Sequence, residues 1–146
     1  MITTSLDGRI AVPIETLQEG DFVVSYNINT GENYLTKVKK AITNIRSEYM
    51  AIVILSNGTS LTMTDVHPLY TKEGFKSPRA FTYPELKIGD MVKAQEGWTT
   101  VESIEKYRNI APVTTYTLNV IDLDELIDDS TNDNFYANGI VAHNKC

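Results

Sequence analysis

The sequence predicts an all-β domain, and three observations support this prediction. Short runs rich in Val, Ile, Thr and Tyr are separated at close intervals by turn-forming residues, as in antiparallel sheets. Two Asn-Gly pairs, Asn57-Gly58 and Asn138-Gly139, stand between such runs, and Asn-Gly is a strong hairpin signal. No long stretch has the periodicity of an amphipathic helix. Strands at this density without helices favour a closed or strongly curved β architecture.

The expected strands follow one another along the whole chain. They cover 9–14, 22–26, 34–44, 50–55, 59–63, 91–94, 98–107, 114–120, 134–136 and 140–142. Asn57-Gly58 and Asn138-Gly139 should form the tightest hairpin turns, because both residue types tolerate positive φ at the two turn positions. Single helical turns are expected at 14–18 and 84–88.

Two segments of the chain are similar to each other. Residues 17–23 and 86–92 each contain Leu, two further residues, Gly-Asp and then an apolar strand, and each precedes an expected hairpin. Chance is one explanation, because Gly-Asp before a strand is a common turn. The match in the two halves instead predicts a duplication, with two similar β units packed about a pseudo-twofold axis.

Composition limits the classes of function. The 146 residues suit one domain with its own core, and the net charge of -6 argues against a phosphate-binding surface and hence against nucleic acid. No apolar run is long enough to span a bilayer, and no signal peptide opens the chain, so neither a membrane partner nor a location is assigned. Acidic residues crowd into one stretch, which favours a solvated loop over a calcium site of EF-hand type. They are Asp122, Asp124, Glu125, Asp128, Asp129 and Asp133.

The chemistry-bearing residues gather in two motifs. Thr64-Asp-Val-His67 follows an expected hairpin, and residues 134–144 end in Ala-His143-Asn144. These motifs contain the chain's two histidines. Each motif alone has a plain explanation: a structural histidine, a strand threonine or a polar tail. Together, Thr-x-x-His and the ending Ala-Asn-Gly-Ile-Val-x-His-Asn resemble the Hint superfamily of hedgehog and intein autoprocessing domains, most closely a mini-intein or bacterial intein-like domain.

The resemblance implies a flattened, horseshoe-shaped β fold with both chain ends at a central site. In the family, an N-terminal Cys or Ser attacks its own preceding carbonyl, and a Thr and a His hold and protonate the scissile amide. Those roles fall here on Thr64 and His67. An amide is planar and its nitrogen leaves poorly, so protonation or twisting must assist it. An imidazole that titrates near neutrality suits this task.

At the other end, the family's terminal Asn attacks its own backbone carbonyl and forms a succinimide. This role falls on Asn144, with Asn144–Lys145 as the scissile bond and His143 polarising the carbonyl or protonating the departing nitrogen. The family often has an Asp and a further His at two positions that are here Thr117 and Asp133. Asp133 is a candidate for orienting His143, and membership of the acidic loop is an equal alternative.

The sequence departs from the family at both junctions. Met1 carries no ionisable proton and cannot make the acyl shift, so either the opening segment has been removed or the domain has lost its N-terminal nucleophile. Ser5 is a poor substitute, because it falls inside the expected first hairpin. Splicing requires Cys, Ser or Thr directly after the Asn, whereas Lys145 follows here and Cys146 comes one residue late. The departure after Asn144 points to cleavage rather than splicing.

The leading hypothesis is an autoprocessing domain at 1–144, followed by flanking residues 145–146, that acts once on its own chain. Its partners would be its own flanking segments, and the isolated domain is expected to be a monomer. Neither a cofactor nor a metal is implied, because one cysteine and two histidines are a weak ligand set. One alternative is a catalytically inactive Hint module with a structural or interaction role. Another is a generic β-barrel binding domain, in which the two histidines would lie far apart.

Overall fold

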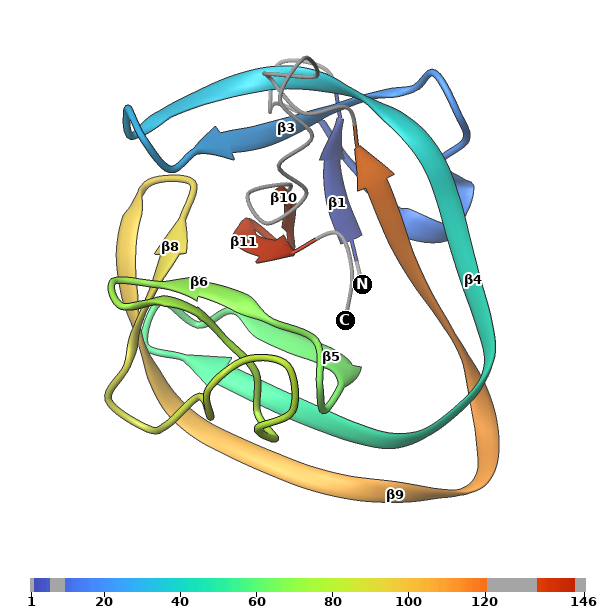
Figure 1. The fold of residues 1–146 in the computed structure, drawn as a ribbon, viewed down its shortest axis with the longest axis vertical. Helices are drawn as coiled ribbons and strands as arrows, with labels where there is room; N and C mark the ends of the chain where they lie inside the picture. The colour runs from blue at the N-terminus through green and yellow to red at the C-terminus, as the bar shows by residue number, and fades with distance from the viewer. Residues whose placement is uncertain (1, 6–9, 121–133, 144–146) are drawn as a thin grey trace.

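The computed structural model describes residues 2–5, 10–120 and 134–143, which form a sheet of eleven antiparallel strands (Figure 1). The all-β prediction is confirmed, since the helical content is one 3-10 turn in the described chain, η1 (Ile14–Thr16). The strands are β1 (Ile2–Ser5), β2 (Ile10–Pro13), β3 (Phe22–Asn27), β4 (Glu32–Leu55), β5 (Ser60–Thr64), β6 (Leu69–Thr71), β7 (Gly74–Lys76), β8 (Met91–Ala94), β9 (Gly97–Val120), β10 (Asn134–Ala137) and β11 (Ile140–His143).

Strands β4 and β9 form the outer frame of the molecule. Each is 24 residues long, and they pair antiparallel from Val38↔Val120 to Leu55↔Val101 (Figure 1). The sequence predicted two strands in place of each, which is wrong. Bulges absorb the bend, for example between Asn44 and Ser47, so the ladder continues through the polar segment that separates the apolar runs.

Two local expectations have different outcomes. The helical turn expected at 14–18 is present as η1, whereas 84–88 is not helical. Ser77 holds that second segment extended, because its backbone N donates to the carbonyl of Pro84 (3.0 Å) and its carbonyl accepts from the N of Leu86 (2.7 Å). Strands β1 and β2 form the expected first hairpin, in which Ser5 pairs with Ile10.

The first copy of the repeated segment is a turn that fastens β3 to β4. The Oδ2 atom of Asp21 accepts a hydrogen bond from the N of Gln18 (2.9 Å), and the N of Asp21 donates to the carbonyl of Gln18 (3.1 Å). Gly20 donates to the carbonyl of Val38, and Val38 donates to the carbonyl of Asp21, both at 2.8 Å. Gly20 has a φ of +92°, which suits glycine.

The second copy makes the same hydrogen bonds in the same order. Lys87 donates to Asp90 Oδ2 (2.8 Å) and accepts from the Asp90 N (3.1 Å), while Gly89 donates to Val101 (2.9 Å) and Val101 donates to Asp90 (2.8 Å). Gly89 has a φ of +96°. The first copy fastens to β4 and the second to β9, and these two strands pair with each other. The similarity in sequence is therefore a structural repeat, as the predicted pseudo-twofold arrangement requires.

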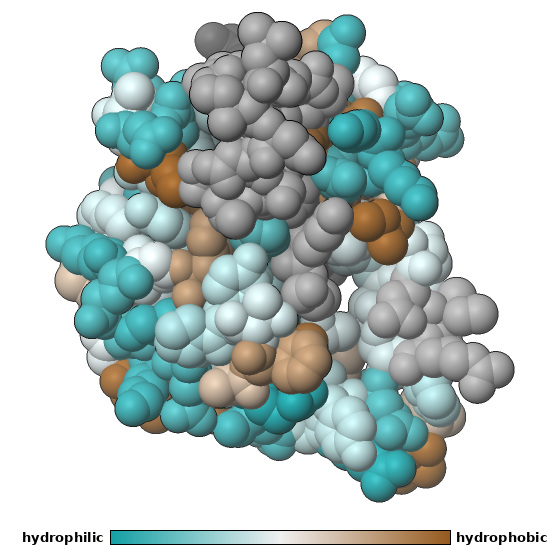
Figure 2. Space-filling view, viewed as in Figure 1, coloured by the Kyte–Doolittle hydropathy of each residue, from teal (hydrophilic) through white to brown (hydrophobic). Residues whose placement is uncertain are grey.

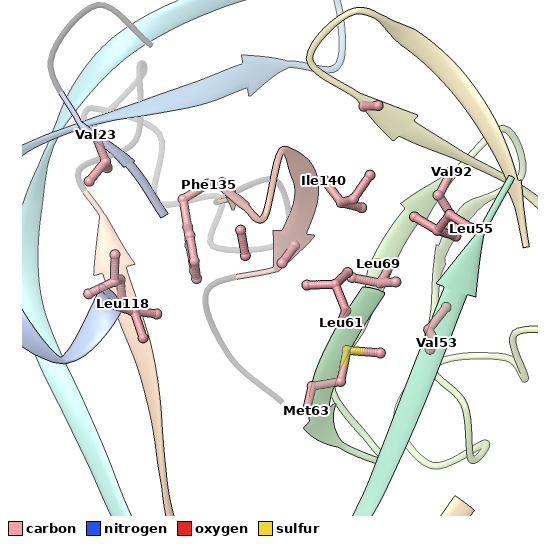
Figure 3. Close-up of a cluster of buried hydrophobic side chains, with 14 of the residues drawn as sticks. Val23, Val53, Leu55, Leu61, Met63, Leu69, Val92, Leu118, Phe135 and Ile140 are labelled. Atoms are coloured by element: carbon pink, nitrogen blue, oxygen red, sulfur yellow. The ribbon is translucent and has the colours of Figure 1, made fainter. Parts of the chain in front are cut away.

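The hairpin of β10 and β11 occupies the middle of the molecule (Figure 1), and every residue of both strands is buried. Figure 3 shows Phe135 on the side of Val23 and Leu118, and Ile140 on the side of Leu61 and Leu69. Burial of each such side chain contributes about 1.5–3 kcal/mol. The core therefore fixes the strand that ends at His143.

The two Asn-Gly turns differ from each other. Asn138 and Gly139 both have positive φ, 51° and 76°, as predicted for a two-residue hairpin turn. At Asn57-Gly58 the prediction of positive φ at both positions is wrong, since only Gly58 has it (87°). The backbone N of Leu55 donates to the carbonyl of Thr59 (2.9 Å), so three residues, 56–58, form this loop, against two in the Asn138-Gly139 loop. A three-residue loop of this kind needs one left-handed residue, at its last position, which is Gly58.

The outer surface is mixed in polarity. Figure 2 shows hydrophilic residues over much of the visible rim, with hydrophobic residues in separate small patches. Within residues 2–5, 10–120 and 134–143, no helix is long and apolar enough to cross a membrane.

Candidate functional site

The Thr-x-x-His motif forms a turn between β5 and β6. The backbone N of His67 donates to the carbonyl oxygen of Thr64 (3.1 Å), so both residues reach one cleft of about 650 Å³. Thr117 of β9 lines the same cleft. His67 is buried, with 3 % of its surface exposed. The turn therefore brings together Thr64 and His67, and the fold adds Thr117 to the same cleft.

Asp65 anchors this turn, a role that the sequence did not indicate. Its backbone N donates to the carbonyl of Tyr49 (3.1 Å), and its own carbonyl accepts from the backbone N of Arg79 (2.7 Å). Its buried carboxylate also accepts a hydrogen bond from Nε of Arg79 (2.9 Å). The turn is thus held to β4 on one side and to the segment after β7 on the other.

Strand β11 carries His143 to the same turn. Ala142 pairs with Leu69 of β6, and the backbone N of His143 donates to the carbonyl oxygen of Pro68 (3.0 Å). The imidazole of His67 in turn forms a hydrogen bond with the backbone of His143. The two histidines, from opposite halves of the chain, therefore lie side by side, and both are buried.

Burial lowers the pKa of His67 from 6.5 to about 4. The positive charge of a protonated His143 lowers the pKa further, and the hydrogen bond to the His143 backbone opposes this effect. The expectation that this imidazole titrates near neutrality is wrong for this reason. At neutral pH His67 is an uncharged hydrogen-bonding group.

Two aromatic side chains enclose the ring of His143. The hydroxyl of Tyr83 lies 3.2 Å from Nε2 of His143, and the Phe75 ring packs edge-on at 4.8 Å between centroids. Burial raises the pKa of Tyr83, so its hydroxyl keeps its proton at neutral pH. Sequence reasoning missed both residues, because they lie outside the two motifs. The only signal was a concentration of aromatic residues within 75–83.

Asn134 fixes the central hairpin to β3. Its side-chain Oδ1 accepts from the backbone N of Tyr26 (2.9 Å) and from Oγ of Ser25 (3.0 Å), and its Nδ2 donates to the carbonyl of Tyr26 (2.9 Å). Asn134 is fully buried and pairs with His143 across the hairpin. The side-chain amide of Asn134 therefore bonds both backbone groups of Tyr26, as the backbone of a neighbouring strand would. This fixes β10, the strand that pairs with His143 of β11. The sequence indicated only the start of a strand here.

Several predicted site residues lie outside the described part of the chain. They are Asp133, Asn144, Lys145 and Cys146. Met1 also lies outside the described residues. In the parts that are described, no group of three or more His, Cys, Asp or Glu side chains is placed to hold a metal ion. The described site therefore consists of the Thr64–His67 turn, His143 and the groups that hold them.

The fold matches solved inteins and an intein-like domain along nearly its whole length. It superposes on a bacterial intein-like domain from Clostridium thermocellum with a TM-score of 0.79 at 22 % identity, covering 98 % of this chain and 94 % of that one. A DnaB intein from Synechocystis sp. PCC 6803 gives a TM-score of 0.80 at 18 % identity, covering 99 % and 94 %. The gp41-1 intein gives 0.72 at 21 %, covering 98 % and 93 %. At these identities the likeness establishes the fold.

No curated protein sequence matches the chain significantly. A family model does: the pretoxin HINT domain matches residues 1–145. That span includes the Thr64–His67 turn, the central hairpin and His143, and it excludes a generic β-barrel with accidental motifs. The chain belongs to the pretoxin HINT domain family.

Proposed function

We propose that this domain cleaves its own backbone after Asn144 by cyclisation of the Asn144 side chain. One observation carries the proposal: β11 delivers buried His143 to the His67 turn, and Asn144 is the next residue in the sequence. A fixed general acid directly beside a candidate scissile bond supplies proximity, which can provide a large part of the barrier reduction.

The proposed reaction is an intramolecular rearrangement that needs no cofactor. The Nδ2 atom of Asn144 attacks the backbone carbonyl carbon of the same residue and forms a ring. The bond from this carbon to the nitrogen of Lys145 then breaks. The proton lost from Nδ2 is balanced by the proton gained at the leaving nitrogen. The products are a succinimide at residue 144 and a chain that begins with the free amine of Lys145.

His143 assists both stages in this scheme. An N–H of its imidazole donates to the carbonyl oxygen as negative charge develops there, or protonates the departing nitrogen. His143 is 4 % exposed and His67 is 3 % exposed. Exclusion of water strengthens such hydrogen bonds, because the local dielectric constant is low.

Thr64 and His67 have a separate proposed role at the N-terminal junction. With His67 uncharged at neutral pH, this pair would bind the peptide amide before the domain by hydrogen bonds rather than by transfer of a full charge. Thr117 lines the same cleft and adds a hydroxyl. Asp133, which precedes the strand paired with β11, is a further candidate for orienting His143.

The residue after Asn144 favours cleavage over splicing. Lys145 has no hydroxyl or thiol on its β-carbon to form the ester that splicing requires, and Cys146 would need a larger transfer ring.

The matched family is described as a pretoxin domain. On this proposal, the segment released after Asn144 would be the toxin part of such a precursor.

A reporter protein fused after Cys146 tests the proposal. Purified fusion is incubated at neutral pH and release of the reporter is followed by gel electrophoresis, with Asn144→Ala as the control. The proposal expects release from the native fusion and none from the control. If both fusions stay whole for days, including with a Cys-containing segment placed before Met1, the domain is an inactive structural Hint module instead.

A further inference from the structure

Tyr83 is the one described side chain outside the two motifs that hydrogen-bonds the His143 ring in this structure. Its hydroxyl lies 3.2 Å from Nε2, and the two rings lie 5.5 Å apart at an interplanar angle of 48°. Phe75 packs against His143 and lies 6.0 Å from the Tyr83 ring. These three rings form a closed contact set, so the imidazole has little freedom to turn.

The segment that carries Tyr83 is itself fixed. Ser77 bonds to the backbone of Pro84 and Leu86 on the C-terminal side of Tyr83, and the carbonyl of Tyr83 accepts a hydrogen bond from the N of Phe81 (3.2 Å). Leu86 is 2 % exposed and anchors the segment in the core. The hydroxyl is therefore presented to His143 by a held backbone rather than by a free loop.

The direction of the hydrogen bond between the Tyr83 hydroxyl and Nε2 goes with the tautomer of the His143 imidazole. The tautomer of a neutral imidazole is set by the hydrogen bond at its other nitrogen. A phenol hydroxyl that donates to Nε2 leaves the proton on Nδ1. For cleavage after Asn144, His143 must present an N–H to the following peptide. With Nε2 engaged by Tyr83, that N–H is the one on Nδ1.

We propose that Tyr83 is a positioning residue for chain cleavage, whose hydroxyl donates to Nε2 of His143 and holds the imidazole in the Nδ1–H tautomer. This inference rests on the proposed cleavage after Asn144 and adds to it a residue that lies outside both sequence motifs. Phe75 contributes by packing, since its edge-on contact restricts rotation of the ring.

The first arm of the test reads the tautomer directly. Long-range proton–nitrogen spectra of the ¹⁵N-histidine-labelled domain, in an Asn144→Ala background that keeps the chain whole, distinguish protonated from unprotonated ring nitrogens. The expected result is protonation of Nδ1 of His143, shifting toward Nε2 in Tyr83→Phe. The matched control is Tyr136→Phe, which removes a hydroxyl that donates to Asn33 and should leave the His143 spectrum unchanged.

The second arm reads the reaction. In the reporter fusion with native Asn144, Tyr83→Phe should cleave roughly tenfold or more slowly than the native chain, while Tyr136→Phe cleaves at nearly the native rate. A proton on Nε2 in the native domain, an unchanged tautomer in Tyr83→Phe, or equal cleavage rates would overturn the inference. A native fusion that never cleaves would overturn the proposed function instead, and the spectra would still report whether Tyr83 sets the tautomer.

Discussion

The imidazole of His67 hydrogen-bonds the backbone of His143, so a turn from the first half of the chain holds the last described residue of the second. This contact depends on the pairing of β11 with β6, because the His143 N also donates to the carbonyl of Pro68. The stability of the fold and the position of His143 therefore depend on the same contacts. Measurements of the free energy of unfolding and of the cleavage rate distinguish the two.

The first prediction concerns the pH dependence of stability. The folded pKa of His67 is about 4, below its ordinary value of 6.5, so between these values the unfolded chain binds a proton that the folded chain does not. The free energy of unfolding should fall by about 3 kcal/mol as pH falls from above 6.5 to about 4. Urea unfolding of native and His67→Gln domains measures this. Equal slopes against pH in the two proteins would contradict the assignment.

The second prediction separates the two histidines in the reaction. His143→Gln removes the proposed acid beside the scissile bond, and we expect reporter release to slow by about 10²–10⁴-fold. His67→Gln changes a neighbouring group that bonds the His143 backbone and does not adjoin the scissile bond in the sequence, so it should slow release less. Initial rates of release at neutral pH measure both effects. A larger loss in His67→Gln than in His143→Gln would reverse the assigned roles.

The third prediction concerns Asn134. Asn134→Ala removes the amide that bonds Ser25 and both backbone groups of Tyr26, and we expect a loss of about 3 kcal/mol in the free energy of unfolding, because buried polar groups lose their partners. Asn138→Gly is the matched control. Its amide donates to Ser60 at an exposed position, and glycine accepts the positive φ, so a change of about 0.5 kcal/mol or less is expected. Similar losses in the two variants would refute the anchoring role.

The fourth prediction tests the repeat. Asp21→Ala and Asp90→Ala each remove a carboxylate that caps the corresponding turn, and each should cost about 1 kcal/mol. Asp90→Ala should cost slightly more, since Asp90 also contacts Lys76 at 3.4 Å. Thermal unfolding of the two variants provides the comparison. A loss in one variant with none in the other would show that the two turns are not equivalent in energy.

Local patterns in the sequence predicted the parts of the fold that depend on local geometry. The left-handed turn at Asn138-Gly139 and the two Gly-Asp turns follow from residue types that tolerate or require those conformations. The continuity of β4 and β9 could not be predicted, because bulges keep a ladder intact through residues that look like a break.

The site was predicted only where its motifs are continuous in sequence. Thr64 and His67 lie in one turn, whereas Tyr83 reaches His143 only through the packing of the segment after β7. Asn134 looked like the start of a strand, and its pairing with Tyr26 depends on where β3 lies. The pKa of His67 likewise follows from burial, which no local pattern reveals.

The central claim is that the Asn144 side chain cuts the chain, and intact mass spectrometry of the released N-terminal product tests it most directly. The product is collected at early times from the native reporter fusion, beside Asn144→Ala. We expect a product that ends at residue 144 as a succinimide, converting slowly to Asn, and no product from the variant. A product that ends elsewhere, or equal cleavage of Asn144→Ala, would contradict it.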